Sequence, residues 1–249
     1  MPTKKLQIPT ADGQADAFAA FPDGARRNPG VLLYTDVFGI RPVLEDRARE
    51  LAEHGYYVLV PNVYYRHGPA PLVALPEHID EETRPKLVAQ LMPLVRAHTT
   101  DHVLRDAEAY LGFLADQPEV SPGPVAVIGY CMGAVLAMRT AAAHPDRVAA
   151  VAGFHPGNLV TDAPDSPHLL VPRITAQVHL GHAEKDMTPQ ARGTLDEALT
   201  ATGVGHTSEV YPGTLHGFTM SDTQAFDPAA LQRHWDRLLP LLDRTLSTT

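Results

Sequence analysis

The chain has little of several features that mark special classes of protein. It contains one cysteine in 249 residues, so it cannot form an intramolecular disulfide, and a disulfide-stapled fold is excluded. It has no apolar run near the roughly 18 residues that a membrane-spanning helix needs, which argues against an integral membrane protein. Basic residues are outnumbered, with 20 Lys and Arg against 29 Asp and Glu, so a nucleic-acid partner is not expected. A globular protein that acts on small molecules remains.

The organisation of the chain is equally plain. It shows no internal repeat or low-complexity tract, and its 23 prolines are scattered rather than gathered in a linker. We therefore expect one domain over residues 1–249. Residues 1–20 lack the apolar core of a signal peptide, which together with the single cysteine predicts a cytoplasmic protein. Composition sets no oligomeric state.

Short apolar runs alternate with helical periodicities along the chain. The runs predict strands at 31–34, 56–60, 125–128, 148–151, 174–180 and 207–211. The periodicities predict a helix from Pro42 to Gly55, two within 81–116, and others at 132–143, 189–202 and the C-terminal end, where an apolar stripe comprises Leu231, Trp235, Leu238, Leu239 and Leu242. This alternation predicts an α/β fold with a mostly parallel sheet. In such folds ligands bind beyond the carboxyl ends of the strands, so we expect the functional residues in the loops there.

A candidate nucleophile follows the predicted strand at 125–128, in the run Gly129-Tyr130-Cys131-Met132-Gly133. A sharp strand-to-helix turn needs small residues two positions before and after the nucleophile, and both glycines meet that need. The turn also places Cys131 at a helix N-terminus, which favours the reactive thiolate, and directs the Met132 N–H toward an oxyanion. A lone cysteine is more often a buried structural thiol, but strand, glycines and helix in register favour the nucleophile.

A cysteine nucleophile needs a histidine, and in this fold the partners follow in the order nucleophile, acid, histidine. His216 lies in a glycine-bracketed loop directly after the last predicted strand. The acid should follow the preceding strand, where Glu184 and Asp186 compete. Asp186 stands just before a probable helix start and is favoured, while a solvated or helix-capping carboxylate is the ordinary explanation for either.

With these residues in place, the chain resembles the dienelactone hydrolase family of α/β-hydrolases over nearly its whole length. The resemblance is carried by Asp36-Val37-Phe38-Gly39, Gly129 to Gly133, the loop from Gly181 to Pro189, and Tyr211-Pro212-Gly213 with His216-Gly217-Phe218. It implies an α/β-hydrolase fold, in which helices flank both faces of the mostly parallel sheet. It also implies a triad of Cys131, His216 and Asp186 that cleaves a small ester or lactone through an acyl-thioester. It implies no metal and no organic cofactor. It also implies a second oxyanion donor, the backbone N–H of Val37.

The chain departs from the family pattern in its charged residues. The acid of the first motif is a glutamate that interacts with the resting cysteine in the best-known members, whereas here it is Asp36, one methylene shorter. We expect Asp36 to modulate the nucleophile or contact substrate. Enzymes that open dienelactones use an arginine four residues after the catalytic histidine, where this chain has Met220. Arg84 loosely matches a second such arginine and Arg66 is another candidate anion contact, although a surface arginine explains either more simply.

The acid loop also looks short, because Pro189 follows Asp186 by three positions, and this keeps Glu184 open as the triad acid. The apolar Met220 keeps open a broader esterase or thioesterase for less polar acyl groups. A non-catalytic binding or redox-sensing protein with an oxidisable Cys131 is a further alternative.

A metal site is suggested by His98 and His102, which stand four residues apart on a predicted helix. No cysteine cluster or H-E-x-x-H motif accompanies them, so a solvated helix face explains this pair better.

Overall fold

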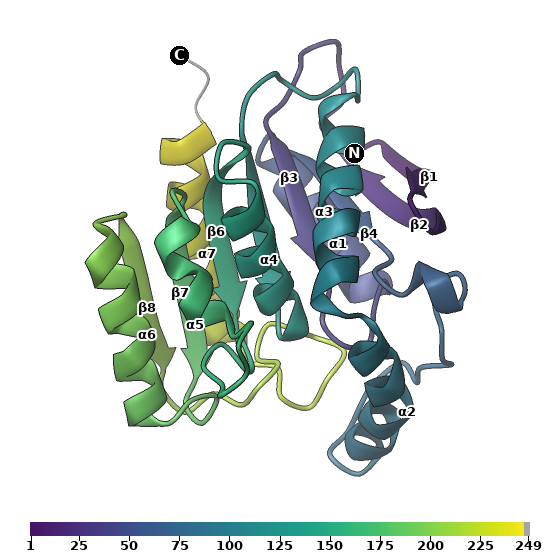
Figure 1. Cartoon of the computed structure of the whole chain (residues 1–249). Coiled ribbons are helices and arrows are strands. Elements are labelled where there is room, and N and C mark those ends of the chain that lie inside the picture. The colour runs from purple at the N-terminus through teal and green to yellow at the C-terminus, as the bar shows by residue number, and fades with distance from the viewer. Residues whose placement is uncertain (247–249) are drawn as a thin grey trace.

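The computed structural model describes residues 1–246, which form one twisted sheet with helices on both sides (Figure 1). The strands are β1 (Thr3–Thr10), β2 (Gly13–Ala20), β3 (Gly30–Tyr34), β4 (Tyr57–Pro61), β5 (Val125–Tyr130), β6 (Val148–Phe154), β7 (Gln177–Ala183) and β8 (His206–Tyr211). They lie in the order β1-β2-β4-β3-β5-β6-β7-β8. Pairing is parallel from β4 across to β8 and antiparallel at β1-β2 and β2-β4, which confirms the predicted mostly parallel sheet.

The helices divide between the two faces of the sheet. They are α1 (Pro42–Glu53), α2 (Thr83–Ala97), α3 (Thr100–Ala115), α4 (Met132–Ala143), α5 (Pro167–Leu170), α6 (Pro189–Thr202) and α7 (Pro228–Leu246), with 3-10 turns η1 (Tyr65–His67) and η2 (Val171–Arg173). Apolar side chains of α3, α4 and α6 share one core cluster, and those of α1 and α7 share another on the opposite face. The prediction of helices on both faces is therefore confirmed.

The hairpin of β1 and β2 was not predicted. In β1 only Ile8 is buried and the neighbouring side chains are exposed or half-buried, because this strand lies at the edge of the sheet. An edge strand with Lys4 and Lys5 lacks the apolar run that marks the central strands.

The predicted strand at 174–180 was wrong in its bounds, since β7 runs from Gln177 to Ala183. Ile174 is a buried residue that follows η2, and its apolar character mimics a strand start. His182 lies inside the strand rather than in the loop. The acid loop therefore begins three residues later than expected, directly at Glu184.

The parallel strands bring the loops after β3, β5, β7 and β8 to one edge of the sheet (Figure 1). This edge carries the first motif, the cysteine turn, the acid loop and the histidine loop. Every helix within residues 1–246 is too short or too polar to span a bilayer.

Candidate active site

Cys131 occupies the turn between β5 and α4 in a strained backbone conformation. Its φ of 54° and ψ of −116° are values that residues other than glycine rarely adopt, and such strain clusters at functional sites. A Cβ added to Gly129 would lie 2.1 Å from the carbonyl oxygen of Gly133. A Cβ added to Gly133 would lie 2.5 Å from the carbonyl oxygen of Tyr34, at the end of β3. Strand and helix therefore approach so closely that only glycine fits, and the half-buried thiol stands above the sheet edge.

His216 reaches Cys131 from the loop after β8. Its Nε2 lies 3.0 Å from the Cys131 Sγ, and its Nδ1 lies 2.7 Å from Oδ1 of Asp186. Burial disfavours the imidazolium, but hydrogen bonds and charge interactions with Asp186 and Cys131 outweigh it and raise the pKa of His216 to about 10. These contacts therefore favour the protonated imidazole at His216.

The two competing acids lie in different places. The Asp186 side chain is only 4% exposed, and its Oδ2 accepts a hydrogen bond from the Ala183 N–H at 2.8 Å. Glu184 is exposed and accepts a hydrogen bond from the Gly213 N–H at 3.0 Å, so it supports the turn that precedes the histidine. The structure thus brings Asp186 to His216 and directs Glu184 elsewhere.

The two expected oxyanion donors, Val37 and Met132, lie on segments that the Tyr64 side chain connects. Met132 is the first residue of α4, and its N–H has no intrahelical partner. The Tyr64 hydroxyl lies 3.2 Å from the Val37 carbonyl oxygen and 3.4 Å from the Met132 Sδ, and its single proton is directed at these two acceptors. Tyr64 is buried in the loop after β4 and carries no motif, so sequence reasoning missed it. It ties the Val37 loop to the start of α4.

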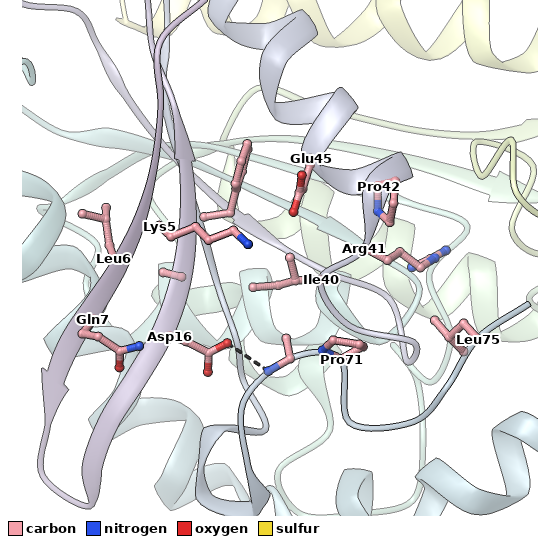
Figure 2. Close-up of a pocket in the computed structure, with 13 residues that line it drawn as sticks. Lys5, Leu6, Gln7, Asp16, Ile40, Arg41, Pro42, Glu45, Pro71 and Leu75 are labelled. Carbon is pink, nitrogen blue, oxygen red and sulfur yellow. Dashed lines mark hydrogen bonds between the residues drawn. The ribbon is translucent and has the colours of Figure 1, made fainter. Parts of the chain in front are cut away.

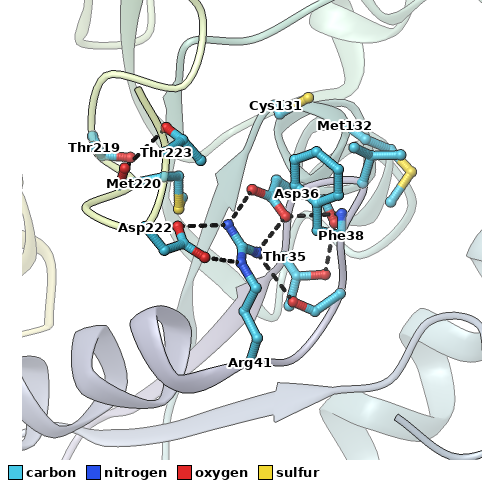
Figure 3. A network of polar contacts seen from close by, with 12 residues as sticks. Thr35, Asp36, Phe38, Arg41, Cys131, Met132, Thr219, Met220, Asp222 and Thr223 are labelled. Carbon is cyan, nitrogen blue, oxygen red and sulfur yellow. Dashed lines mark hydrogen bonds and ion pairs between the residues drawn. The ribbon is translucent and has the colours of Figure 1, made fainter. Parts of the chain in front are cut away.

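Asp36 is held by hydrogen bonds from Arg41 and from its own loop. Its carboxylate accepts two hydrogen bonds from Arg41, at 2.7 and 2.9 Å, and a third from the Phe38 N–H at 3.0 Å (Figure 3). The expected role of Asp36 as modulator of the nucleophile or as substrate contact stays a prediction. Because Arg41 occupies both carboxylate oxygens, Asp36 acts as a structural group that holds the Val37 loop.

Arg41 also binds the segment that follows the histidine. Its Nε donates to Asp222 Oδ2 at 2.6 Å and its Nη2 to Asp222 Oδ1 at 3.3 Å. The Arg41 and Asp36 side chains are 4% and 5% exposed, and Asp222 is 20% exposed. One buried guanidinium thus connects the Val37 loop to the segment after His216, as Figure 3 shows. No motif marks Arg41 or Asp222 in the sequence.

Arg41→Leu is expected to lower the free energy of unfolding by about 3–5 kcal/mol, because it leaves two carboxylates without their buried partner. Urea unfolding measures the loss. Arg49→Leu is the matched control, since Arg49 pairs with Glu45 and Asp46 on the exposed side of α1 and should cost at most about 1 kcal/mol. Equal losses in the two variants would show that the buried ion pairs of Arg41 contribute no more to the free energy of unfolding than exposed ones.

The other two arginines have different positions. Arg84 lines the cavity above the triad, and its Nη1 donates to the His216 carbonyl at 2.9 Å. Arg66 pairs with Asp12 and Asp106 at 2.6 and 2.7 Å and does not line that cavity. The substrate contact expected at Arg66 stays a prediction, and the structure shows its charge paired with two carboxylates. Met220 is buried in the core that includes α1 and α7.

A cavity of about 560 Å³ opens at the triad, between α2, α4 and the loop before α5. Its lining includes Cys131, His216, Val37 and Met132. A second hollow of about 430 Å³ lies between β1, β2 and the start of α1, and Figure 2 shows Lys5, Asp16 and Ile40 among its lining residues. That second hollow contains none of the triad residues.

His98 caps the C-terminus of α2 and His102 lies in the first turn of α3, so the two histidines do not share one helix as expected. The rings of His98 and His102 are 6.3 Å apart, and the His102 Nδ1 is hydrogen-bonded to the Ala97 carbonyl. Among residues 1–246, no group of three or more His, Cys, Asp or Glu side chains is placed to hold a metal ion.

Solved structures share this architecture. A chain from Klebsiella pneumoniae superposes with a TM-score of 0.84 at 20% identity, covering 98% of both chains. The dienelactone hydrolase-like promiscuous phosphotriesterase P91, from metagenomic libraries, gives a TM-score of 0.79 at 23% identity and covers 99% of this chain and 100% of its own. The chain therefore has the α/β-hydrolase fold.

Sequence comparison extends the likeness. A carboxymethylenebutenolidase from Pseudomonas sp. strain P51 is 27% identical over 218 residues, 88% of this chain and 85% of its own. Carboxymethylenebutenolidase 1 from Cupriavidus pinatubonensis is 28% identical over 86% of this chain and 85% of its own. The dienelactone hydrolase family profile matches residues 15–246. The chain belongs to the dienelactone hydrolase family.

Proposed function

We propose that this enzyme hydrolyses small carboxylic esters or lactones with Cys131 as nucleophile, His216 as acid and base, and Asp186 as the group that orients the imidazole. One observation carries the proposal: the continuous contact from Sγ through the imidazole to the buried carboxylate, at 3.0 and 2.7 Å, at the mouth of a cavity. Relatives named carboxymethylenebutenolidase support this class of substrate.

The reaction follows from the positions of these groups. The Cys131 thiolate attacks the carbonyl carbon, and the N–H groups of Val37 and Met132 stabilise the oxyanion. When the intermediate collapses, the C–O bond breaks and the leaving alkoxide takes the proton from the His216 Nε2. A water molecule then transfers a proton to Nε2 and attacks the thioester. The carboxylic acid departs, and the thiolate and imidazolium are restored.

Arg84 gives this site a cation near the reacting groups. It is half-buried, it lines the cavity, and among residues 1–246 it has no carboxylate within ion-pair distance. We propose that Arg84 binds an anionic group of the substrate, a role that an arginine with a free face can fill by a paired hydrogen bond.

Trapping of the acyl group on the enzyme tests the mechanism. A short 4-nitrophenyl ester is mixed with the protein, quenched within milliseconds and analysed by intact-protein and peptide mass spectrometry. We expect a burst of nitrophenolate and one acyl group per chain on Cys131, the only cysteine of the chain, with neither in Cys131→Ala. Undiminished turnover by a folded Cys131→Ala protein would remove the proposal. Peroxide oxidation of Cys131 without acylation by any ester would favour a redox sensor instead.

A further inference from the structure

The cavity extends away from the triad along two helices. On α4 its lining comprises Met132, Val135, Leu136 and Arg139, and on α2 it comprises Arg84, Val88, Met92 and Val95. These positions recur at intervals of three and four residues, so each helix turns one face toward the cavity. In each set three members are apolar, and the arginine stands at one end: Arg139 is last on α4 and Arg84 is first on α2. The cavity is therefore a channel with apolar walls that leads from Cys131 toward Arg139.

The length of this channel follows from helix geometry. Arg139 is eight residues beyond Cys131, which corresponds to about 12 Å along α4. A helical side chain leans back toward the N-terminus, which shortens the gap from sulfur to guanidinium to about 8 Å. An acyl chain of about six carbons spans that gap.

Arg139 forms a polar end to the channel and has donors to spare. Its Nη2 donates to Asp165 Oδ2 at 2.8 Å and to the Asp165 carbonyl at 3.3 Å, while its Nε is buried with no hydrogen-bond partner among residues 1–246. The Arg139 side chain is 15% exposed, whereas that of Asp165 is 46% exposed. Burial lowers the pKa of Arg139 although Asp165 opposes the shift, so the guanidinium loses more hydration than one carboxylate replaces.

The charges along the channel favour an anion. Arg84 and Arg139 face it against the single carboxylate of Asp165, in a protein whose formal net charge is −9. His98 lies at the same end as Arg139, and burial lowers its pKa to about 4, so it adds a polar ring without charge at neutral pH. The channel is thus positive where the chain as a whole is negative.

The triad determines which part of an ester enters the channel. The leaving oxygen must face the His216 Nε2, which donates the proton, and Arg84 lies on that side through its bond to the His216 carbonyl. The acyl part then points away from the histidine, along α4.

We propose that the channel selects esters whose acyl chain of about six carbons ends in a carboxylate, and that Arg139 binds this carboxylate. The inference rests on the proposed hydrolysis at Cys131. It assigns Arg139 to substrate specificity and not to the chemical step.

Two matched esters test the proposal: 4-nitrophenyl hexanoate and the mono-4-nitrophenyl ester of hexanedioic acid. The measured quantity is the ratio of kcat/KM for the diacid ester over the hexanoate. We expect Arg139→Met to lower this ratio about tenfold to a hundredfold, and Arg139→Lys to lower it less. Arg147→Met is the control, since Arg147 pairs with Glu108 at the surface and does not line the channel, and it should keep the wild-type ratio.

The experiments distinguish a missing carboxylate subsite from a wrong hydrolysis mechanism. If Cys131 is acylated but Arg139→Met keeps the wild-type ratio, the carboxylate subsite is overturned and the mechanism stands. The carboxylate subsite would also be overturned if methylation of the free carboxylate of the diacid ester raised its kcat/KM with the wild-type enzyme. If no ester acylates Cys131, calorimetric titration of Cys131→Ala with hexanedioate and with hexanoate still tests the carboxylate subsite. Tighter binding of hexanedioate that depends on Arg139 supports the subsite, and equal binding rejects it.

Discussion

Asp186→Asn is expected to lower kcat for ester hydrolysis by about ten-thousandfold while the chain remains folded. The Asp186 Oδ1 accepts the Nδ1 proton of His216 at 2.7 Å, and its Oδ2 accepts the Ala183 N–H. Asparagine keeps the second bond through its carbonyl but offers an N–H group to Nδ1, which stabilises the wrong imidazole tautomer. Steady-state kinetics with a 4-nitrophenyl ester, beside circular dichroism of both proteins, measures the effect.

Glu184→Gln provides the matched comparison. Its amide oxygen can still accept the Gly213 N–H, so we expect kcat within about threefold of the wild type, as for a surface substitution. The opposite result, with loss in Glu184→Gln and normal turnover in Asp186→Asn, would reassign the triad acid.

Asp186→Asn should also change how activity and stability depend on pH. Because the folded-state pKa of His216 is raised to about 10 from 6.5, protonation of this histidine stabilises the fold fully below pH 6.5, and that contribution is lost as pH rises through 10. Without Asp186 the pKa of His216 should fall. We expect the alkaline limb of kcat/KM to move to lower pH in Asp186→Asn, and the fall in unfolding free energy between pH 6.5 and 10 to shrink.

Gly133→Ala is expected to cost more than about 4 kcal/mol of unfolding free energy, enough to leave little folded protein. The new Cβ would lie 2.5 Å from the Tyr34 carbonyl oxygen and 2.6 Å from that of Thr35, distances that no rotamer relieves because both partners are backbone. Relief requires α4 to move away from the end of β3, which carries the Val37 loop. Any folded fraction should therefore also lose oxyanion stabilisation. Urea unfolding and kcat of the folded fraction measure both effects.

Gly112→Ala is the control for this substitution. Gly112 lies within α3, and a Cβ there would meet nothing within 4 Å, so alanine should stabilise the chain by about 1 kcal/mol through helix propensity. Destabilisation in both variants would mean that the loss at Gly133 does not report the close approach of α4 and β3.

Local sequence determined the elements that are buried on both faces and the turn between β5 and α4. The central strands are apolar runs because water reaches neither side of them, and α1 and α7 show periodic apolar residues because one face packs on the sheet. Gly133 faces distant residues at the end of β3, whereas the steric demand at Gly129 comes from Gly133, within the same five-residue turn. Such demands act at short range along the chain, so the fold class, the cysteine turn and the order of the loops could be predicted from the residues alone.

Tertiary structure decided what depends on distant partners. The β1–β2 hairpin lies at an edge, where burial imposes little pattern, and Ile174 is buried by packing rather than by a strand. The contact between Arg41 and Asp222 joins residues 181 positions apart, and the same holds for the pairing of Arg66 with Asp106 across 40. The partner of a carboxylate or a guanidinium depends on which residues the fold brings next to it. Residue type therefore predicted which groups can do chemistry, and only the folded chain determined which of them face the cavity.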